Sequence, residues 1–261
     1  MEKYSKFTKR EPNFNTTTAT VDVFSLNVVF DNNVLDGLSE YIVSQYMDAE
    51  SISMLAEVCG YTVPEYIDLF VLPNTITARK VAVGEFGEII SSDILEEHYG
   101  YVVPRYKLKN KPDCNVAAPL VDIIGYKMKG DLPSENDILC LAEVKTNLSA
   151  NVRKAEYSAF EEVNTKLLNN IRNCKTVNYF FNQARLLNDL STVSHLRRFM
   201  KKSENEYSVE KYGFTITIGS YPKDSDYSFI TSGLEDNKHF VYVYSDNMDK
   251  VFEEGYSRKR K

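Results

Sequence analysis

The stretch Asp137-Ile-Leu-Cys-Leu-Ala-Glu-Val-Lys145 determines the fold that we expect for this chain. Five apolar residues in a row, Ile138 to Ala142, are typical of a strand that is covered on both faces. The run ends abruptly in Glu143-Val-Lys145. Because side chains at positions i and i+2 of a strand point to the same face, Glu143 and Lys145 are predicted to project side by side from the end of a buried strand.

The strand predicted before it, over residues 119–127, carries one acid in an apolar run, Asp122 in Leu120-Val-Asp-Ile-Ile124. A buried carboxylate is costly to ionise and needs a cation, a metal or hydrogen bonds. Two acids and a lysine on adjacent strands would meet this need by binding a hard divalent ion such as Mg²⁺, which prefers oxygen ligands.

An acid-x-Lys triplet also arises by chance in a chain with 37 acidic and 31 basic residues, as in the polar segment Asp236-Asn-Lys238. Taken alone, Glu143-Val-Lys145 is equally compatible with a solvated strand end. The ordered combination of a helix, an acid-bearing strand and an apolar strand ending in Glu-x-Lys favours a functional site.

Around this centre, the apolar periodicity predicts a helix over 84–98 and three strands over 101–108, 119–127 and 137–145. A helical region follows over about 151–201, with a break near Asn173, and two strands close the pattern at 213–219 and 240–244. This order predicts an α/β fold, a mixed sheet flanked by helices.

Upstream, the pattern predicts a strand over 20–30 and helices over about 34–46, 50–59 and 64–71. We therefore divide the chain into a mixed α+β part, 1–75, and a core, 76–261.

Composition excludes several classes of protein. The formal net charge is −6, so the molecule as a whole is not a basic nucleic-acid-coating surface, although a local patch or a metal can offset this. The sequence has no HExxH, GxSxG or P-loop motif, and its four cysteines form no CxxC pair. It contains no apolar run long enough to cross a bilayer and no signal peptide, so we expect a soluble cytoplasmic protein.

Asp122 followed by Glu143-Val-Lys145 within this order of elements resembles the PD-(D/E)xK nuclease superfamily, whose fold is restriction-endonuclease-like. A narrower resemblance is carried by Gly84-Glu-Phe-Gly-Glu88 at the helix start and the lysine-rich segment 107–111. Together these motifs resemble the nuclease subunit of Hachiman anti-phage defence systems. That resemblance implies a Mg²⁺-dependent DNA endonuclease, for which Mn²⁺ is expected to substitute, restrained by a superfamily-2 helicase partner.

The resemblance also implies roles for individual residues. Asp122 and Glu143 would coordinate the metal, and Lys145 would orient the attacking water or stabilise charge on the phosphate. Glu88 or Glu85 would add a ligand from the helix; we prefer Glu88, one turn further in, while Glu85 is more simply a first-turn acid that the helix dipole stabilises.

One departure from the family pattern leaves the first metal ligand open. Residue 121 is Val, so the Pro-Asp dipeptide is missing at Asp122, whereas a literal Pro112-Asp113 stands in a polar segment. We prefer Asp122 because its strand is apolar and because Asp113 is typical of a turn. Asp113 is the alternative.

Several basic side chains are candidates for phosphate contacts. Arg105, Lys107, Lys109 and Lys111 alternate along the predicted strand 101–108 and its end, as a phosphate-contacting stripe or as protection of an exposed edge. Arg153 and Lys154 begin the following helix, where they would contact phosphate or solvent. The basic residues 258–261 are interpreted as solvated.

Two other functions fit the same residues. One is a stand-alone restriction endonuclease, acting as a homodimer. The other is a non-catalytic partner-binding subunit on a nuclease-like fold, since related scaffolds host different activities. We expect residues 1–75 to contact the partner protein.

Overall fold

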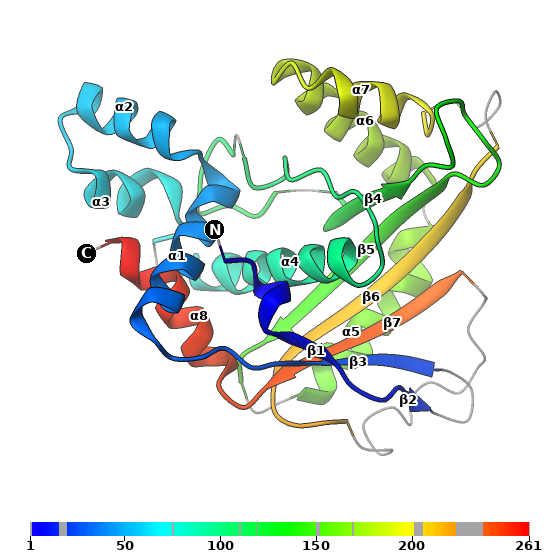
Figure 1. Ribbon diagram of the computed structural model, residues 1–261, viewed down its shortest axis with the longest axis horizontal. Helices are drawn as coiled ribbons and strands as arrows, with labels where there is room; N and C mark the ends of the chain where they lie inside the picture. Colours follow the sequence, from blue (N-terminus) through cyan, green and yellow to red (C-terminus); the bar gives the residue numbers. More distant parts are fainter. Residues whose placement is uncertain are drawn as a thin grey trace.

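The computed structural model describes residues 2–15, 20–74, 76–109, 111–118, 120–149, 152–168, 170–200, 206–222 and 237–260. Its centre is a curled mixed sheet with the strand order β1-β3-β7-β6-β5-β4, in which β2 also pairs with β3 (Figure 1). The strands are β1 (Thr8–Arg10), β2 (Phe14–Asn15), β3 (Thr20–Leu26), β4 (Ile123–Lys127), β5 (Ile138–Asn147), β6 (Ser208–Ile218) and β7 (Lys238–Ser245). The four central strands β3, β7, β6 and β5 are parallel, and the outer strands run antiparallel to them. The predicted α/β class is confirmed.

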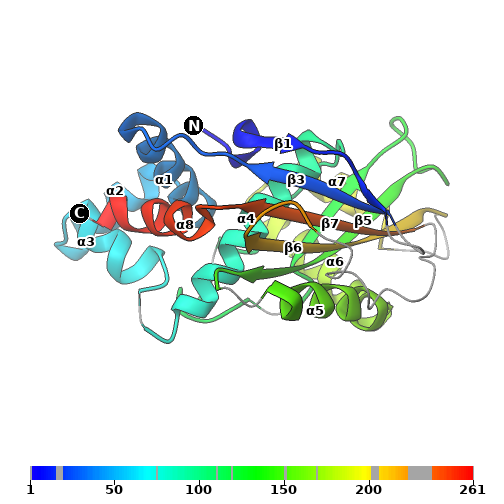
Figure 2. The same cartoon turned by 90° about the horizontal axis from the view of Figure 1, so that it is seen from below.

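Helices flank both faces of the sheet and gather at one end of it. They are α1 (Asn32–Tyr46), α2 (Ala49–Cys59), α3 (Val63–Tyr66), α4 (Arg79–Glu97), α5 (Val152–Thr165), α6 (Asn170–Leu186), α7 (Leu190–Arg197) and α8 (Met248–Ser257). Single turns extend this set as η1 (Tyr4–Phe7), η2 (Ile67–Val71), η3 (Lys166–Leu168) and η5 (Arg258–Arg260). In both views α1, α2, α3 and α8 cluster beyond one end of the sheet (Figures 1 and 2). No helix in the described ranges is both long and apolar enough to span a bilayer.

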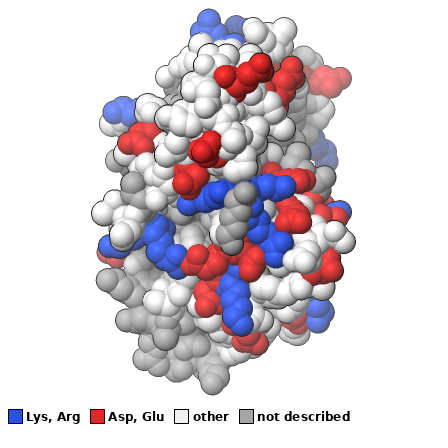
Figure 3. Space-filling view, turned by 90° about the vertical axis from the view of Figure 1, so that its left-hand side faces the viewer, with Lys and Arg blue, Asp and Glu red and all other residues white. Residues whose placement is uncertain are grey.

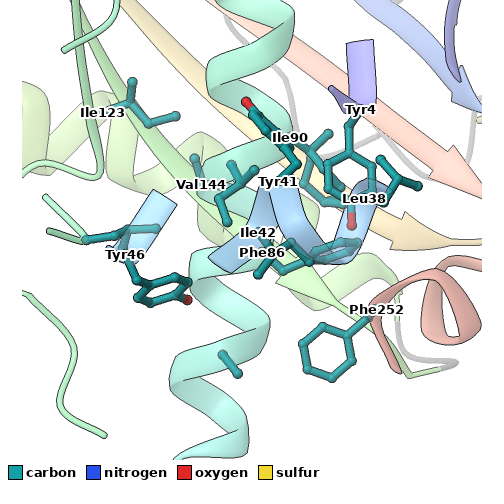
Figure 4. Close-up of a cluster of buried hydrophobic side chains, with 14 of the residues drawn as sticks. Tyr4, Leu38, Tyr41, Ile42, Tyr46, Phe86, Ile90, Ile123, Val144 and Phe252 are labelled. Carbon is teal, nitrogen blue, oxygen red and sulfur yellow. The ribbon is translucent and has the colours of Figure 1, made fainter. Parts of the chain in front are cut away.

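Strand β5 separates two hydrophobic cores because its side chains alternate between the faces. Ala142 and Val144 pack in the core beneath α4, whereas Leu139 and Leu141 pack in the core shared with α5, α6 and α7. On the α4 side, Tyr4, Phe86 and Phe252 converge from three distant parts of the chain (Figure 4). The apolar run that the sequence analysis starts from is therefore covered on both faces, as predicted.

The helix α4 lies unusually close to β5 at Gly87. A Cβ atom there would lie 1.8 Å from Thr146 Oγ1 and 3.1 Å from Val144 Cγ1. Glycine is required here by the close approach of the two backbones. This contact fixes the helix residue Glu88 against the strand that carries Glu143 and Lys145.

The prediction of a strand over residues 101–108 is wrong. Only an isolated pairing of Val102 with Tyr126 forms there, and residues 103–106 have no regular structure. Pro104 has no N–H to continue a strand ladder. The basic residues after it turn instead toward acids on α4, as described below.

Other boundaries also differ from the prediction. Strand β4 begins at Ile123 rather than 119, and Leu120 has a positive φ of 87° that a strand does not accommodate. The break expected near Asn173 is wrong, because α6 runs continuously through that residue from 170 to 186. A further helix, α8, was not predicted.

The segment 1–75 is joined to the remainder by strand pairing and by side-chain contacts. β3 pairs in parallel with β7, and Ser39 Oγ on α1 donates to the carbonyl oxygen of Gly255 on α8 at 2.8 Å. The boundary after residue 75 stays a prediction. The interpretation of the basic tail as solvated is wrong: Arg258 pairs with Asp36 at 3.0 Å, and Lys259 pairs with Glu40 at 2.8 Å.

Candidate active site

Glu143 lies near the middle of β5 and is almost fully buried, with 1% of its surface exposed. Its neighbour on β6 is Gly213, where a Cβ atom would collide with Val163 and Phe240. Glu143 accepts a hydrogen bond from Arg172 Nη1 on α6 at 2.5 Å. Burial raises the pKa of Glu143 to about 7; the charge of Asp122 adds to this effect and Arg172 opposes it. Its carboxyl group can therefore gain or lose a proton near neutral pH.

Lys145 follows two residues later on the same face and is more exposed. Its ammonium group lies 2.6 Å from Glu162 Oε2 on α5, and Glu162 also pairs with Lys166 at 2.5 Å. Glu162 also lies close enough to Glu143 to contribute to raising its pKa. The two residues of the Glu-x-Lys motif are thus linked through one acid that the sequence analysis did not identify.

Asp122 is the central acid of the site. It lies just before β4, and its Oδ2 accepts the backbone N–H of Val144 at 2.8 Å. Its charge contributes to raising the pKa of Glu143 on one side and of Glu88 on the other. Three acids from α4, from the residue before β4 and from β5 therefore lie in one neighbourhood.

Glu88 and Asp122 share one cation. Lys107 Nζ lies 2.9 Å from Glu88 Oε1 and 3.1 Å from Asp122 Oδ1. Burial raises the pKa of Glu88 to about 8, an effect that Lys107 opposes and Asp122 increases. Between the two helix acids considered from the sequence, Glu88 is the one beside Asp122.

Glu85 belongs to a separate buried group. It pairs with Lys111 at 2.5 Å and accepts a hydrogen bond from the hydroxyl of Tyr46 at 2.7 Å. Burial raises the pKa of Glu85, and Lys111 opposes the shift. Asp113, the alternative first ligand, is exposed in a turn where its Oδ1 accepts the N–H of Asn115 at 2.8 Å.

The phosphate-contacting stripe does not form as expected. Arg105 binds Asp93 and Glu96 at 2.8 Å each, and Lys107 and Lys111 bind the acids named above, so these cations lie against α4. The side chains of Arg153 and Lys154, in the first turn of α5, lie outside the described residues. Seen from the end where α1 and α8 lie, basic and acidic side chains lie next to one another across the middle of the face (Figure 3).

The side chains of this site carry the oxygen ligands that hard cations prefer, but they are not arranged as a metal-binding site. Glu88, Asp122 and Glu143 offer carboxylate oxygens, the ligands that Mg²⁺ prefers. However, within the described ranges no group of three His, Cys, Asp or Glu side chains is placed to hold a metal ion. Protein cations occupy the carboxylates instead: Lys107 contacts Glu88 and Asp122, and Arg172 contacts Glu143.

Sequence reasoning missed Arg172 and Glu162 and gave Lys107 another role. Arg172 Nη2 also donates to the carbonyl oxygen of Leu120 at 2.6 Å, which ties α6 to the chain just before Asp122. All three side chains come from elements remote in sequence from their partners. No local pattern marks them, because Arg172 and Glu162 lie on helices with other polar residues and Lys107 lies in a basic loop.

A comparison with models of protein families identifies the family of this chain. The family model HamA matches residues 3–254, which is nearly the whole chain. The chain belongs to the HamA family. HamA is the nuclease-like protein of the Hachiman anti-phage defence system, so the narrower resemblance drawn from the sequence is confirmed. Membership of HamA in the PD-(D/E)xK superfamily stays a prediction. No curated protein matches the chain.

Proposed function

We propose that this protein is the DNA-cleaving effector of a Hachiman defence system, a divalent-metal-dependent endonuclease. The observation that carries the proposal is the grouping of Glu88, Asp122 and Glu143 near Lys145, around the middle of the buried strand β5. Buried acids whose pKa values are raised by burial and by one another are typical of functional sites. The HamA assignment independently supports a nuclease-like role in defence.

The roles of the residues follow from their charge and exposure. Lys145 is the most accessible group of the motif, and its ammonium charge would stabilise the negative charge that develops on a phosphate undergoing attack. Glu162 holds that ammonium group in place. Asp122 and Glu143 are the proposed metal ligands and Glu88 an auxiliary one. The metal, Mg²⁺ or Mn²⁺, is part of the proposal.

The decisive experiment is cleavage of supercoiled and linear DNA by the purified protein, with Mg²⁺ and with EDTA. Glu143→Gln and Lys145→Met should each abolish cleavage, and EDTA should abolish it in the wild type. Matched controls are Glu97→Gln on the exposed side of α4 and Lys250→Met on α8, which remove the same charges away from the site. Circular dichroism melting establishes that every variant is folded.

Two outcomes would contradict the proposal. Cleavage that survives both site substitutions would place the activity elsewhere or in a contaminant. A folded wild-type protein that cuts neither DNA nor RNA with Mg²⁺ or Mn²⁺, with or without its partner, would favour the non-catalytic partner-binding role.

We also propose that a superfamily-2 helicase restrains this nuclease. The proposal rests on the HamA assignment, because Hachiman is a defence system in which partners are implied. Adding the helicase encoded with this chain should suppress cleavage of intact plasmid, and a helicase from an unrelated system is the control. Equal cleavage with and without the cognate helicase would refute restraint while leaving the nuclease proposal in place.

A further inference from the structure

A basic segment, residues 105–109 and 111, lies along the acidic side of α4. Arg105 pairs with Asp93 and Glu96, Lys111 pairs with Glu85, and Lys107 pairs with Glu88 between them. The ion pairs of Arg105 and Lys111 connect this segment only to acids of α4. Lys107 differs, because its ammonium group also reaches Asp122 in front of β4. It is therefore the cation that joins the helix acid to the sheet acid.

The ammonium group of Lys107 stands where a metal ion would have to bind these two acids. Only 6% of Lys107 is exposed, and both of its contacts are direct, at 2.9 and 3.1 Å. The cavity beside Glu88, Asp122 and Lys107 has a volume of about 30 Å³. That is room for about two water molecules and not for a phosphodiester.

We propose that Lys107 holds the cation position of this site in the resting protein, and that a divalent metal ion binds by displacing the Lys107 ammonium group. The inference rests on the proposed function for the presence of a metal, and it adds the condition under which the metal enters. Asp122 Oδ2 is already bound to the N–H of Val144, so a metal ion would compete with Lys107 for Oδ1.

Lysine suits a displaceable cation better than arginine does. Its ammonium is a compact point charge on a flexible four-carbon stem, without the fixed fork that arginine presents to carboxylates. Arg105, two residues earlier, binds two acids through its guanidinium group and would keep the segment on α4 while Lys107 moves. The displacement thus requires movement of one side chain, and α4 stays in place.

The first test compares Mn²⁺ binding by the wild type, Lys107→Met and Lys109→Met, measured by calorimetry. Lys109→Met removes the same charge from the same segment, and its side chain lines a different cavity. Lys107→Met should bind Mn²⁺ at least about tenfold more tightly than the wild type, which corresponds to about 1.4 kcal/mol. Lys109→Met should bind like the wild type. Equal or weaker binding by folded Lys107→Met overturns the proposal.

The second test uses the wild-type protein and does not depend on the folding of a variant. Lysine acetylation is followed by mass spectrometry in EDTA and in saturating Mn²⁺. Lys107 should be acetylated faster with Mn²⁺, while the equally buried Lys111, paired with Glu85, should be unchanged. Unchanged or slower acetylation of Lys107 in the metal-saturated protein overturns the proposal.

The two proposals fail in different ways. If Mn²⁺ releases Lys107 and the protein still cleaves no nucleic acid, the displacement is right and the nuclease function is wrong. If neither the wild type nor Lys107→Met binds Mn²⁺, the displacement is wrong, whatever the cleavage assay gives.

Discussion

Replacing Gly87 with alanine tests the close contact that places α4 against β5. The added Cβ atom would lie 1.8 Å from Thr146 Oγ1, 3.1 Å from Val144 Cγ1 and 3.2 Å from Thr146 Cβ. Rotation of the Thr146 side chain can remove the first contact. The other two involve atoms next to the β5 backbone, so the helix or the strand has to shift by several tenths of an ångström.

The expected free-energy change is the balance of two effects. Alanine in a helix interior is favoured over glycine by about 1 kcal/mol, and overpacking a tight contact costs about 1–3 kcal/mol. Gly87→Ala should therefore lower the free energy of unfolding by up to about 2 kcal/mol relative to the wild type. Gly84→Ala, one turn earlier with nothing within 4 Å of the added Cβ atom, should raise it by about 0.5–1 kcal/mol.

Urea unfolding of the wild type and the two variants measures these differences. Because helix propensity contributes about equally to both substitutions, the difference between Gly87→Ala and Gly84→Ala isolates the contact with β5. Thr146→Ala in the Gly87→Ala protein should recover part of the loss, since it removes the nearest atom. If Gly87→Ala is as stable as Gly84→Ala, the reasoning about the α4–β5 contact is refuted.

Three further predictions concern the remaining charged groups. Lys111→Met should lower the free energy of unfolding by about 3–5 kcal/mol, because it leaves Glu85 buried without its cation. Glu85→Leu in the same protein should restore most of that loss when unfolding is measured in urea. An additive loss in the double variant would contradict this prediction. Deletion of residues 258–261 should lower the free energy of unfolding by about 1–2 kcal/mol in the same measurement, since each partly exposed ion pair contributes about 0.2–1 kcal/mol. If the stability is unchanged, these residues are solvated, as the sequence suggested. Burial lowers the pKa of His239, which stacks on Tyr212, so the unfolded chain takes up the proton first as the pH falls below about 6.5. His239 therefore contributes a loss of stability from pH 7.5 to pH 5.5, opposite in sign to the contribution of Glu88 and Glu143, whose pKa values are raised. Relative to its stability at pH 7.5, His239→Gln should be more stable at pH 5.5 than the wild type is; identical pH dependence of the two proteins would exclude this contribution.

The centre of the fold was predictable because its signal is local. The apolar run before Glu143 specifies a strand covered on both faces without reference to any other residue, and β5 and its two cores follow from it. The same holds for α4, in which the apolar residues Phe86, Ile89, Ile90 and Leu95 recur at helical spacing. The helix α8 was missed although Met248, Val251, Phe252 and Tyr256 show the same periodicity and are buried.

The partners of the site were not predictable, because tertiary contacts decide them. The alternation of basic residues after Pro104 is typical of a strand edge, yet Arg105, Lys107 and Lys111 form ion pairs with acids on α4 instead. Arg172 and Glu162 reach Glu143 and Lys145 only after α5 and α6 pack on the sheet. A single sequence shows that these groups are charged, and it does not show which opposite charge each one meets.

The position of β3 in the sheet has a consequence for biosynthesis. Its hairpin partners β1 and β2 are made just before it, but its parallel partner β7 begins 212 positions after β3 ends. At about 5–20 residues per second, the ribosome needs about 10–40 s to make that interval. Throughout this time one edge of β3 lacks its strand and is open to pairing with other chains. The parallel pairing at the centre of the sheet can therefore form only after nearly the whole chain has been made, and it is a long-range contact of the kind that slows folding.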